Sequence, residues 1–237
     1  MPHYKKFARV YDALYSFKNY EREAEAVHAL ISAHKKSAGN ALLDVACGTG
    51  AHIAFLKKYY AVEGVDLSEE MLSVARTRHP EIVFHRGDMA KFALARRFDA
   101  VICLFSAIAY MKTRRRLGAA VRNMSRHLAP GGVLIVEPFF GPDTFHEGGV
   151  DALYVNRPEL KIARMTIPAT RDGLWSIKFH MMVGTPDGIE YFTERHEGGL
   201  FSHEDYLQAF SAAGLEVLHD EDGLMGRGLY IATSAPA

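Results

Sequence analysis

Glycines and acids at the end of an expected strand are the first residues in this sequence whose types could do chemistry. The run Ala41-Leu42-Leu43-Asp44-Val45-Ala46 is apolar except for one acid, which is typical of a strand buried on both faces. Gly48 and Gly50 follow it, and glycines at such a turn let the backbone approach a ligand closely. Asp66 ends the next expected strand, where a carboxylate can bind ribose hydroxyls. We therefore expect a nucleoside site at this edge of the sheet.

A dinucleotide-binding loop would need a third glycine that this sequence lacks. That fingerprint is G-x-G-x-x-G, whereas Gly48-Thr49-Gly50 is followed by Ala51, His52 and Ile53. The missing glycine disfavours a bound pyrophosphate and a nicotinamide-dependent oxidoreductase. An adenosine without phosphates is consistent with both the loop and the acids.

A third acid follows the third expected strand. Asp88 and Met89 offer a carboxylate for the edge of an adenine ring and an apolar side chain for its face. Leu67 and Met71 are expected to form the opposite wall. Each residue alone is better explained as part of a turn or a solvated loop. Together they favour a ligand site, because open α/β sheets bind ligands at the carboxyl ends of their strands.

Alternating strands and helices are expected to position these residues. Strands are indicated by apolar segments at 41–46, 61–65, 82–85, 99–105, 133–137, 215–218 and 229–233. Helices are indicated at 4–17, 21–36, 52–59 and 113–128, and after the capping residues Ser68 and Ser202. Pro130-Gly131-Gly132 is expected to separate the last long helix from the fifth strand. The pattern predicts an α/β fold, a mostly parallel sheet with helices on both faces.

A different pattern interrupts this alternation after Gly149. Strands are expected at 153–155, 161–167, 175–183 and 189–197, separated by turn signals. We interpret them as an inserted antiparallel β-sheet. Residues 1–149 then hold the N-terminal helices and the main part of a Rossmann-like domain, residues 150–200 the insertion, and residues 201–237 the return to the first domain.

The inserted sheet is expected to have one apolar face. Its alternating apolar residues are Trp175, Phe179, Met181 and Tyr191. Such a face either covers the active site or pairs with a second subunit. Edge strands of this kind favour dimers, so we expect a homodimer.

The composition excludes several classes of protein. Lys and Arg together number 28, as do Asp and Glu, so the chain lacks the net positive charge that favours a nucleic-acid partner. The longest nearly apolar run, at 100–111, is too short to span a membrane, and the N-terminus lacks the apolar core of a signal peptide. Two cysteines and scattered histidines show neither disulfide nor metal-binding spacing. We expect a cytoplasmic protein with no metal, membrane or nucleic-acid partner.

Two motifs together resemble the class I S-adenosyl-methionine-dependent methyltransferases. Asp44 to Gly50 match D-x-A-x-G-T-G, the first motif of that family. Leu128-Ala129-Pro130-Gly131-Gly132-Val133-Leu134 match its turn into the fifth strand. The resemblance implies S-adenosyl-methionine as the cofactor. It also implies a Rossmann-like, seven-stranded sheet whose last strand, here 229–233, is antiparallel.

Further segments are similar to the N,N-dimethyltransferases of dTDP-amino-sugars, the desosamine and mycaminose type of antibiotic biosynthesis. These segments are LLDVACGTG at 42–50, LFSAI at 104–108, VEPFF at 136–140 and GRGL at 226–229. The resemblance implies a nucleotide-linked amino deoxysugar as the substrate and methylation of its amino nitrogen.

The same resemblance implies roles for single residues. The expected cofactor-binding residues are Tyr20, Ala46, Gly48, Asp66, Leu67, Met71, Asp88, Met89 and Leu104. The expected substrate-binding residues are Tyr11, Ser106, Ala107 and Arg227. Tyr11 and Tyr20 are expected to close over the cofactor and the acceptor.

Orientation of the amine is expected to matter more than removal of a proton, because the methyl group of a sulfonium is already activated. The reaction mainly needs a neutral amine lone pair held about 3 to 3.5 Å from the methyl carbon. The expected catalytic residues, which orient the amine, are Tyr11, Tyr110 and Glu137. Ala107 and Ala109 leave room for a second transfer or simply pack tightly.

The diphosphate of such a substrate needs a cationic partner. Arg227 is the preferred candidate, because two glycines bracket it just before the last strand and a guanidinium fork suits phosphate oxygens. Arg164, Arg171 and Lys178 are each better explained as part of a solvated strand face. Arg114-Arg115-Arg116 opens an expected helix and is expected to face solvent.

Two other functions stay open at this point. One keeps the cofactor but methylates nitrogen or oxygen of a different small metabolite. The other is a non-enzymatic sensor of S-adenosyl-methionine that signals through the inserted sheet. Binding of dTDP alone would speak against the first, and methyl transfer to any amine would speak against the second.

Overall fold

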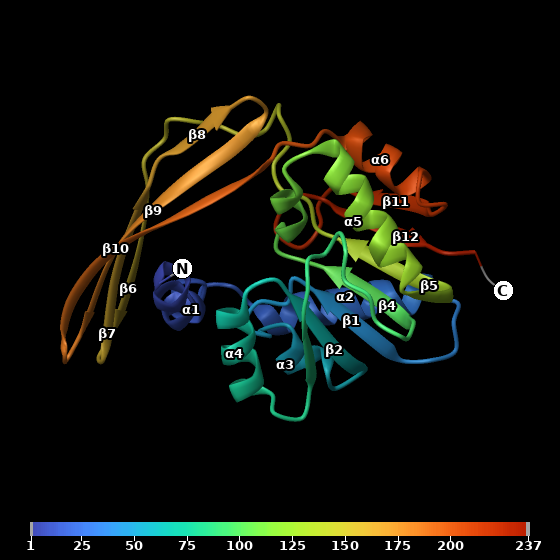
Figure 1. The fold of residues 1–237 in the computed structure, drawn as a ribbon, viewed down its shortest axis with the longest axis horizontal. Helices are drawn as coiled ribbons and strands as arrows, with labels where there is room; N and C mark the ends of the chain where they lie inside the picture. The colour runs from blue at the N-terminus through green and yellow to red at the C-terminus, as the bar shows by residue number, and fades with distance from the viewer. Residues whose placement is uncertain (1, 236–237) are drawn as a thin grey trace.

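A seven-stranded sheet lies between two layers of helices (Figure 1). The computed structural model describes residues 2–235. The strands lie in the order β11-β12-β5-β4-β1-β2-β3. Their bounds are β1 (Ala41–Val45), β2 (Ala61–Asp66), β3 (Val83–Arg86), β4 (Phe98–Cys103), β5 (Leu128–Val136), β11 (Glu216–Asp220) and β12 (Leu229–Thr233).

Strand β1 lies where the strand order reverses. It pairs in parallel with β2 on one side and with β4 on the other. In contrast, β12 runs antiparallel to both β5 and β11. The predicted mostly parallel sheet with an antiparallel last strand is therefore confirmed. A crevice forms at the carboxyl ends of strands beside such a reversal, which places the expected ligand at the ends of β1 and β4.

Helices cover both faces of this sheet (Figure 1). Their bounds are α2 (Tyr20–His34), α3 (Ile53–Leu56), α4 (Glu69–Arg78), α5 (Arg114–Arg126) and α6 (His203–Ser211). Helices α5 and α6 pack on the face that holds Leu43 and Val101. Helices α2, α3 and α4 pack on the face that holds Leu42 and Ala100. Because adjacent strand residues point to opposite faces, these pairs show that the central strands are buried on both sides.

Side-chain caps mark where four of these helices begin, among them α2, whose N-cap Asn19 accepts a hydrogen bond from the Arg22 backbone N–H. The hydroxyls of Ser68 and Thr113 each accept a hydrogen bond from the backbone N–H three residues later, and Ser202 forms a capping box with Asp205. The predicted caps at Ser68 and Ser202 are confirmed. Helix α3 is a single turn and shorter than expected, because residues 57–60 already turn toward β2.

An antiparallel sheet is inserted between β5 and α6, as predicted, but it has five strands, because residues 168–171 form a strand that the sequence did not indicate. Its strands lie in the order β10-β9-β7-β6, and β8 pairs with β9. Their bounds are β6 (Asp151–Arg157), β7 (Leu160–Thr166), β8 (Pro168–Arg171), β9 (Leu174–Thr185) and β10 (Gly188–Gly199). Its two longest strands are β9 and β10, with 12 residues each.

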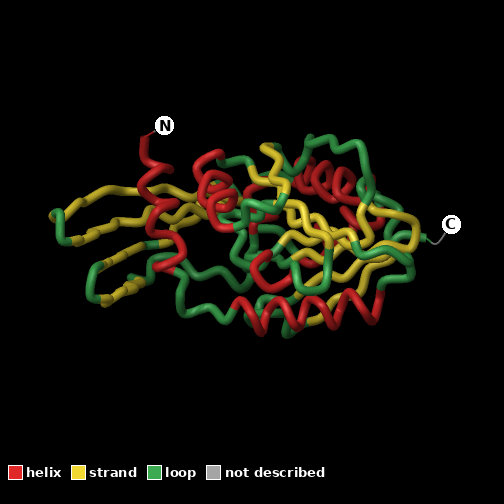
Figure 2. The backbone as a smooth tube through the Cα atoms, turned by 90° about the horizontal axis from the view of Figure 1, so that it is seen from below, coloured by secondary structure: helices red, strands yellow, loops and turns green. Residues whose placement is uncertain are grey.

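Helix α1 (Pro2–Leu14) packs against the apolar face of the inserted sheet. Phe7, Val10 and Leu14 form one buried cluster with Phe179 and Met181 of β9. Figures 1 and 2 show α1 beside the inserted strands and outside the seven-stranded sheet. The apolar face is thus covered by a helix of the same chain, which is neither of the two roles that the sequence suggested for it.

The register of β9 and β10 corrects one predicted residue of this face. Phe192 pairs with Met181. Phe192 therefore points inward and is 5% exposed, whereas Tyr191 points outward and is 60% exposed. The prediction that Tyr191 belongs to the apolar face is wrong, because neighbouring residues of a strand point to opposite sides. Trp175, like Phe179 and Met181, is buried as predicted.

The start of β5 also differs from the prediction. Helix α5 ends at Arg126, and β5 begins at Leu128, so Pro130-Gly131-Gly132 lies inside the strand. The pairing of β4 with β5 shifts register between Phe98 and Ala100. Gly131 has a φ of +72°, so a local irregularity of the strand accommodates these residues.

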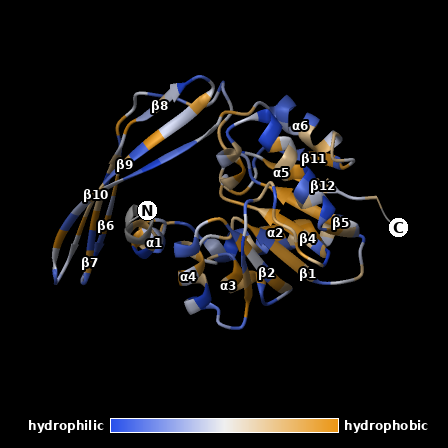
Figure 3. Cartoon of the chain, viewed as in Figure 1, coloured by the Kyte–Doolittle hydropathy of each residue, from blue (hydrophilic) through white to orange (hydrophobic). Residues whose placement is uncertain are grey.

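The distribution of apolar residues agrees with this architecture. Figure 3 shows them concentrated in the strands of the seven-stranded sheet, whereas the inserted strands alternate between apolar and polar. Within residues 2–235, no helix is both long and apolar enough to cross a membrane.

Candidate active site

The glycine loop after β1 is open toward a pocket. Ala46, Gly48 and Gly50 have φ angles of 60°, 56° and 74°. Glycine adopts these angles at little cost, whereas Ala46 is strained, as residues at functional sites often are. A Cβ atom placed on Gly48 would meet no described atom within 4 Å, so this peptide presents an open side. The loop therefore has the shape needed for close approach of a ligand.

The pocket brings together part of the predicted site. Among its lining residues, those expected from the sequence are Tyr11, Tyr20, Ala46, Gly48 and Leu104. The pocket also contains Asp44, the acid of the expected nucleoside site, and residues to which the sequence assigned no role: Cys47, Thr49, Ala51, His52 and Phe105. The carboxyl ends of β1 and β4 thus meet the N-terminal helices here, at the position that the strand order predicts.

Asp66 connects β2 to the glycine loop. Its carboxylate accepts hydrogen bonds from the backbone N–H groups of Gly48 and Ser68, both at 2.8 Å. Burial raises the pKa of Asp66, although the backbone N–H groups act to lower it. A carboxylate can accept about four hydrogen bonds, so part of its capacity is left for ribose hydroxyls. This arrangement fits the expected ribose site.

Asp44 lies beneath the same loop as a fully enclosed carboxyl. Burial raises its pKa to about 8, and the negative charge of Asp66 acts in the same direction. Asp44 is therefore mostly protonated at neutral pH and can donate as well as accept a hydrogen bond.

Asp88, expected to bind the adenine edge, is paired with Arg116, which was expected to face solvent. Arg116 donates from Nη2 to both carboxylate oxygens of Asp88, at 3.0 and 2.8 Å. Burial acts to raise the pKa of Asp88, but Arg116 and the backbone hold it below its usual value. The expectation that Arg114-Arg115-Arg116 faces solvent is thus wrong for Arg116. The first turn of α5 directs its side chain to the loop after β3, which the sequence pattern did not show.

The apolar residues expected around adenine lie in three different environments. Met89 is buried in the core beneath α5 and α6. Met71 is buried in the cluster that contains α1. Leu67 is exposed after β2. Of the three side chains, only that of Leu67 is freely reachable from solvent, and α1 has to be in place for Met71 to be enclosed.

The N-terminal segment covers the pocket from the opposite side. Tyr11 packs edge-to-face on Phe7, and burial raises its pKa well above the usual range, with Tyr15, Tyr20 and Tyr110 acting in the same direction. Tyr11 therefore remains a neutral hydroxyl beside the pocket. Tyr11 thus lines the pocket and is also close enough to Tyr110, in the short helix η1 (Ala107–Met111), for an electrostatic effect.

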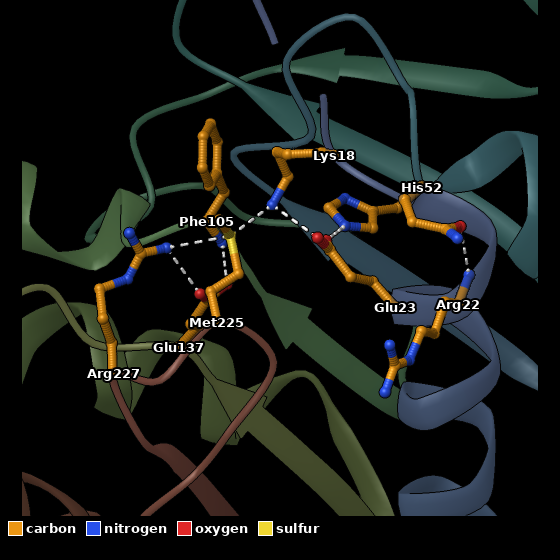
Figure 4. A network of polar contacts seen from close by, with 9 residues as sticks. Lys18, Arg22, Glu23, His52, Phe105, Glu137, Met225 and Arg227 are labelled. Atoms are coloured by element: carbon orange, nitrogen blue, oxygen red, sulfur yellow. Dashed lines mark hydrogen bonds and ion pairs between the residues drawn. The ribbon is translucent and has the colours of Figure 1, made fainter. Parts of the chain in front are cut away.

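A buried ion network supports this cover (Figure 4). Glu23 of α2 accepts from Nζ of Lys18 and Nε2 of His52, each at 2.8 Å. Burial acts to raise the pKa of Glu23, but the bonds to His52 and Lys18 lower it overall. Lys18 also lies 4.1 Å from the centre of the Phe105 ring and 2.8 Å from Sδ of Met225. The sequence carries no local signal for the whole network, because Lys18 and Glu23 are far along the chain from His52, Phe105 and Met225.

Glu137 holds two parts of the site in place. It is 0% exposed and accepts hydrogen bonds from the Phe105 backbone N–H at 2.6 Å and from Arg227 at 2.8 Å (Figure 4). A carboxylate so enclosed is suited to positioning Arg227 and the β4 loop. Direct contact with an amine, as the sequence predicts for Glu137, is not favoured by this burial.

The loop after β4 has a strained backbone. Phe105 and Ser106 have φ angles of 53° and 60°, which cost about 1–3 kcal/mol each for residues other than glycine. The Ser106 hydroxyl donates to the Pro138 carbonyl at 2.6 Å and is buried, as is Ala107. Ser106 and Ala107, which were expected to contact the substrate, therefore pack inside the loop. Phe105 is the residue of this loop segment that lines the pocket.

Two arginines from different elements act electrostatically on the Tyr15 hydroxyl. Arg164 of β7 is only 11% exposed, pairs with Asp151 and is hydrogen-bonded to Tyr15. Burial raises the pKa of Tyr15, and both Arg164 and Arg227 act to lower it, so both guanidinium groups lie near this hydroxyl. Within the described part of the chain, the buried Nε atoms of Arg164 and Arg227 have no hydrogen-bond partner.

The other basic residues proposed for the diphosphate differ from this pair. Arg171 is exposed and pairs with its neighbour Asp172. Arg164 was expected on a solvated strand face, and this is wrong, because the side chain turns inward toward Tyr15 and Phe179. The sequence of a strand shows which residues share a face, but it does not show that α1 covers the face that holds Arg164.

The comparisons with known proteins agree with this geometry. A family model described as a methyltransferase domain matches residues 42–132. Together with the Rossmann-like sheet, this match defines the chain as a methyltransferase. It is 41% identical to the dTDP-3-amino-3,4,6-trideoxy-alpha-D-glucopyranose N,N-dimethyltransferase of Streptomyces venezuelae, over 96% of this chain and 98% of that protein. It is 37% identical to the dTDP-4-amino-2,3,4,6-tetradeoxy-D-glucose N,N-dimethyltransferase of Saccharopolyspora spinosa, over 94% and 91%. The chain belongs to the family of dTDP-amino-sugar N,N-dimethyltransferases.

Solved structures show the same relationship. The crystal structure of Streptomyces venezuelae DesVI is similar with a TM-score of 0.91 and 40% identity, over 97% of this chain and 98% of that one. The structure of CalS10 with S-adenosyl-methionine bound, an amino pentose methyltransferase from Micromonospora echinaspora, gives a TM-score of 0.87 and 39% identity, over 95% and 97%. The likeness includes the inserted sheet, since it covers nearly the whole chain.

Proposed function

We propose that this chain is an S-adenosyl-methionine-dependent enzyme that methylates the amino nitrogen of a dTDP-linked amino deoxysugar twice. The observation that carries the proposal is the similarity, over almost the full length, to several N,N-dimethyltransferases of such sugars. The resemblance of the motifs and the site geometry support the same conclusion.

The site fits the expected cofactor. The open side of Gly48 accommodates a close ligand, and Asp66 retains acceptor capacity for a ribose hydroxyl. Asp88 would hold the adenine edge while Arg116 fixes its carboxylate. When bound, S-adenosyl-methionine supplies a methyl group activated by the positive charge on sulfur.

The amine of the substrate needs orientation more than activation. The nitrogen lone pair forms the new N–C bond, the electrons of the C–S bond stay on sulfur, and the ammonium that results loses a proton to water. This in-line geometry requires a separation of about 3 to 3.5 Å. We infer that the hydroxyls of Tyr11 and Tyr110 orient the amine, and the neutral Tyr11 that lines the pocket supports this role.

The nucleotide part of the substrate is proposed to bind at Arg164 and Arg227. Both guanidinium groups lie near Tyr15, and both have a buried Nε without a partner in the described chain. A buried cationic donor that is left unpaired is costly, and diphosphate oxygens would satisfy it. This feature favours a nucleotide-linked acceptor over another small metabolite.

Calorimetry with dTDP tests this acceptor class without the sugar. We expect the wild-type chain to bind dTDP and Arg164→Met to weaken binding about tenfold, the effect of one charge-assisted hydrogen bond. Arg171→Met, which removes an exposed arginine of the same sheet, should change nothing. If the wild-type chain binds S-adenosyl-methionine but not dTDP, the nucleotide-linked acceptor is wrong.

We also propose that the chain forms a homodimer and acts in the cytoplasm. The outer face of the inserted sheet exposes Tyr154, Met165, Met182 and Tyr191, which a second copy of the chain could cover in a homodimer. Light scattering at micromolar concentration measures the mass directly. A cytoplasmic location is consistent with the two free, buried cysteines, Cys47 and Cys103.

A further inference from the structure

A tyrosine and a histidine join the loop after β4 to the inserted sheet. The Tyr110 hydroxyl of η1 lies 2.9 Å from Nδ1 of His196 on β10. The His196 ring is enclosed by Phe7 of α1 and Phe179 of β9, at centroid distances of 5.2 and 4.7 Å. Three separate elements therefore fix the position of this imidazole.

Tyr110 is also close to the pocket. It lies in the helix that directly follows the loop of Leu104 and Phe105, both of which line the pocket. It acts electrostatically on Tyr11, another lining residue. The Tyr110 side chain is partly exposed, whereas the His196 side chain that it contacts is buried.

The His196 imidazole is neutral, because burial lowers its pKa to about 4. A neutral imidazole has one nitrogen that donates and one that accepts. Among the described residues, Nε2 has no hydrogen-bond partner, and the rings of Phe7 and Phe179 surround the imidazole. Aromatic rings attract an N–H group better than a lone pair. The proton therefore belongs on Nε2, and Nδ1 accepts the hydrogen bond from the Tyr110 hydroxyl.

We propose that His196 is a positioning residue that turns the lone pairs of the Tyr110 oxygen toward the substrate amine, and that this control is decisive for the second methyl transfer. The inference rests on the proposed function and deepens it. With its own proton held by His196, Tyr110 acts toward the substrate as a hydrogen-bond acceptor. It then holds an N–H of the amine so that the nitrogen lone pair points elsewhere, toward the methyl group.

The two transfers differ in how strongly they need this acceptor. A primary amine has two N–H groups, so either one can be held in a productive orientation. After the first transfer only one N–H remains, and the added methyl group creates unproductive rotamers. Loss of the acceptor geometry therefore slows the second transfer more than the first, and the monomethyl product accumulates.

Two substitutions at His196 separate this role from simple packing. In His196→Asn the side-chain oxygen lies near the place of Nδ1 and keeps an acceptor, whereas His196→Leu fills similar space without one. Mass spectrometry of a time course gives the ratio of monomethyl to dimethyl product. We expect His196→Leu to slow the second transfer about fivefold relative to the first, the effect of one neutral hydrogen bond, and His196→Asn to restore the wild-type ratio.

Further variants serve as controls. Tyr110→Phe should reproduce the ratio of His196→Leu, and the double variant should add nothing, since both remove the same interaction. His180→Leu breaks a similar histidine–tyrosine pair on the exposed face, with Tyr191 at 2.6 Å, and should leave the ratio unchanged. An unchanged ratio in folded His196→Leu, or an equal loss in both transfers, would overturn the proposal.

A second measurement does not depend on the substrate. In protein labelled with ¹⁵N at histidine, the nitrogen shifts of His196, assigned with His196→Asn, report the tautomer. We expect Nε2 to carry the proton and the Nδ1 signal to move in Tyr110→Phe. A proton on Nδ1 overturns the positioning role even if the chain dimethylates a sugar. If the expected tautomer is found but no amine is methylated, the proposed function fails instead.

Discussion

Asp12 of α1 accepts a 2.6 Å hydrogen bond from the hydroxyl of Thr49 in the glycine loop. Arg78 of α4 pairs with the same carboxylate and donates to the Thr49 carbonyl at 3.2 Å. Three elements that are distant along the chain thus meet at one point beside the pocket. This contact fixes the helix that carries Tyr11 across the expected cofactor site.

Breaking this contact should speed release of the bound cofactor product. In Asp12→Ala, both Thr49 and Arg78 lose their contact with α1, so this helix is less firmly held. We expect S-adenosyl-homocysteine to dissociate about three- to tenfold faster, as measured by stopped-flow displacement. Glu21→Gln, which breaks the exposed pair with Lys58, is the matched control and should dissociate at the wild-type rate. An unchanged rate in Asp12→Ala would show that α1 does not retain the ligand.

Arg116 should contribute to cofactor affinity without touching the acceptor. Arg116→Met leaves Asp88 without the guanidinium that orients it. We expect the dissociation constant of S-adenosyl-methionine to rise about fivefold while kcat at saturation stays close to that of the wild type. Arg115→Met removes an exposed arginine from the same helix turn and serves as the control. A fall in kcat at an unchanged dissociation constant would contradict this role.

Asp44 should make the chain less stable at high pH. Burial raises its pKa to about 8 in the folded state, against about 3.9 when unfolded. The folded state therefore keeps a proton that the unfolded state releases, so this group stabilises progressively less as pH rises from about 4 to 8. Asp44→Asn cannot ionise, and its melting temperature relative to the wild type should rise between pH 5 and pH 8.5. A difference that is independent of pH would contradict the raised pKa.

Glu137 and Arg227 should depend on each other for stability. Glu137→Gln leaves a largely buried guanidinium without its charged partner, which we expect to cost about 3 kcal/mol in the free energy of unfolding. Urea unfolding measures this change. Glu197→Gln, at an exposed pair with Lys112, should cost less than about 1 kcal/mol. A small effect at Glu137 would mean that Arg227 is readily solvated.

The sequence was sufficient where the information is local. Hydrophobic runs followed by turn residues placed β1, β2 and β4, and the glycine segment placed the loop that lines the pocket. Ser68 and Ser202 were found as caps because capping depends on residues within one turn. The inserted sheet was predicted for the same reason, because apolar segments separated by turn residues after Gly149 are a local signal.

Long-range contacts could not be predicted in this way. The contact of Arg116 with Asp88 depends on how α5 packs over the sheet, and the inward turn of Arg164 depends on α1. The strand register that selects Phe192 over Tyr191 is set by pairing with Met181, which alternation alone does not define.

The most direct test of the account is mass spectrometry of the products formed from S-adenosyl-methionine and a panel of dTDP-linked 3-amino and 4-amino deoxysugars. We predict that one member of the panel gains two methyl groups and that the monomethyl product appears as an intermediate. The position of the nitrogen in that sugar then defines the substrate. If no member of the panel is methylated while the cofactor still binds, the central claim is contradicted, and a different acceptor or a sensor replaces it.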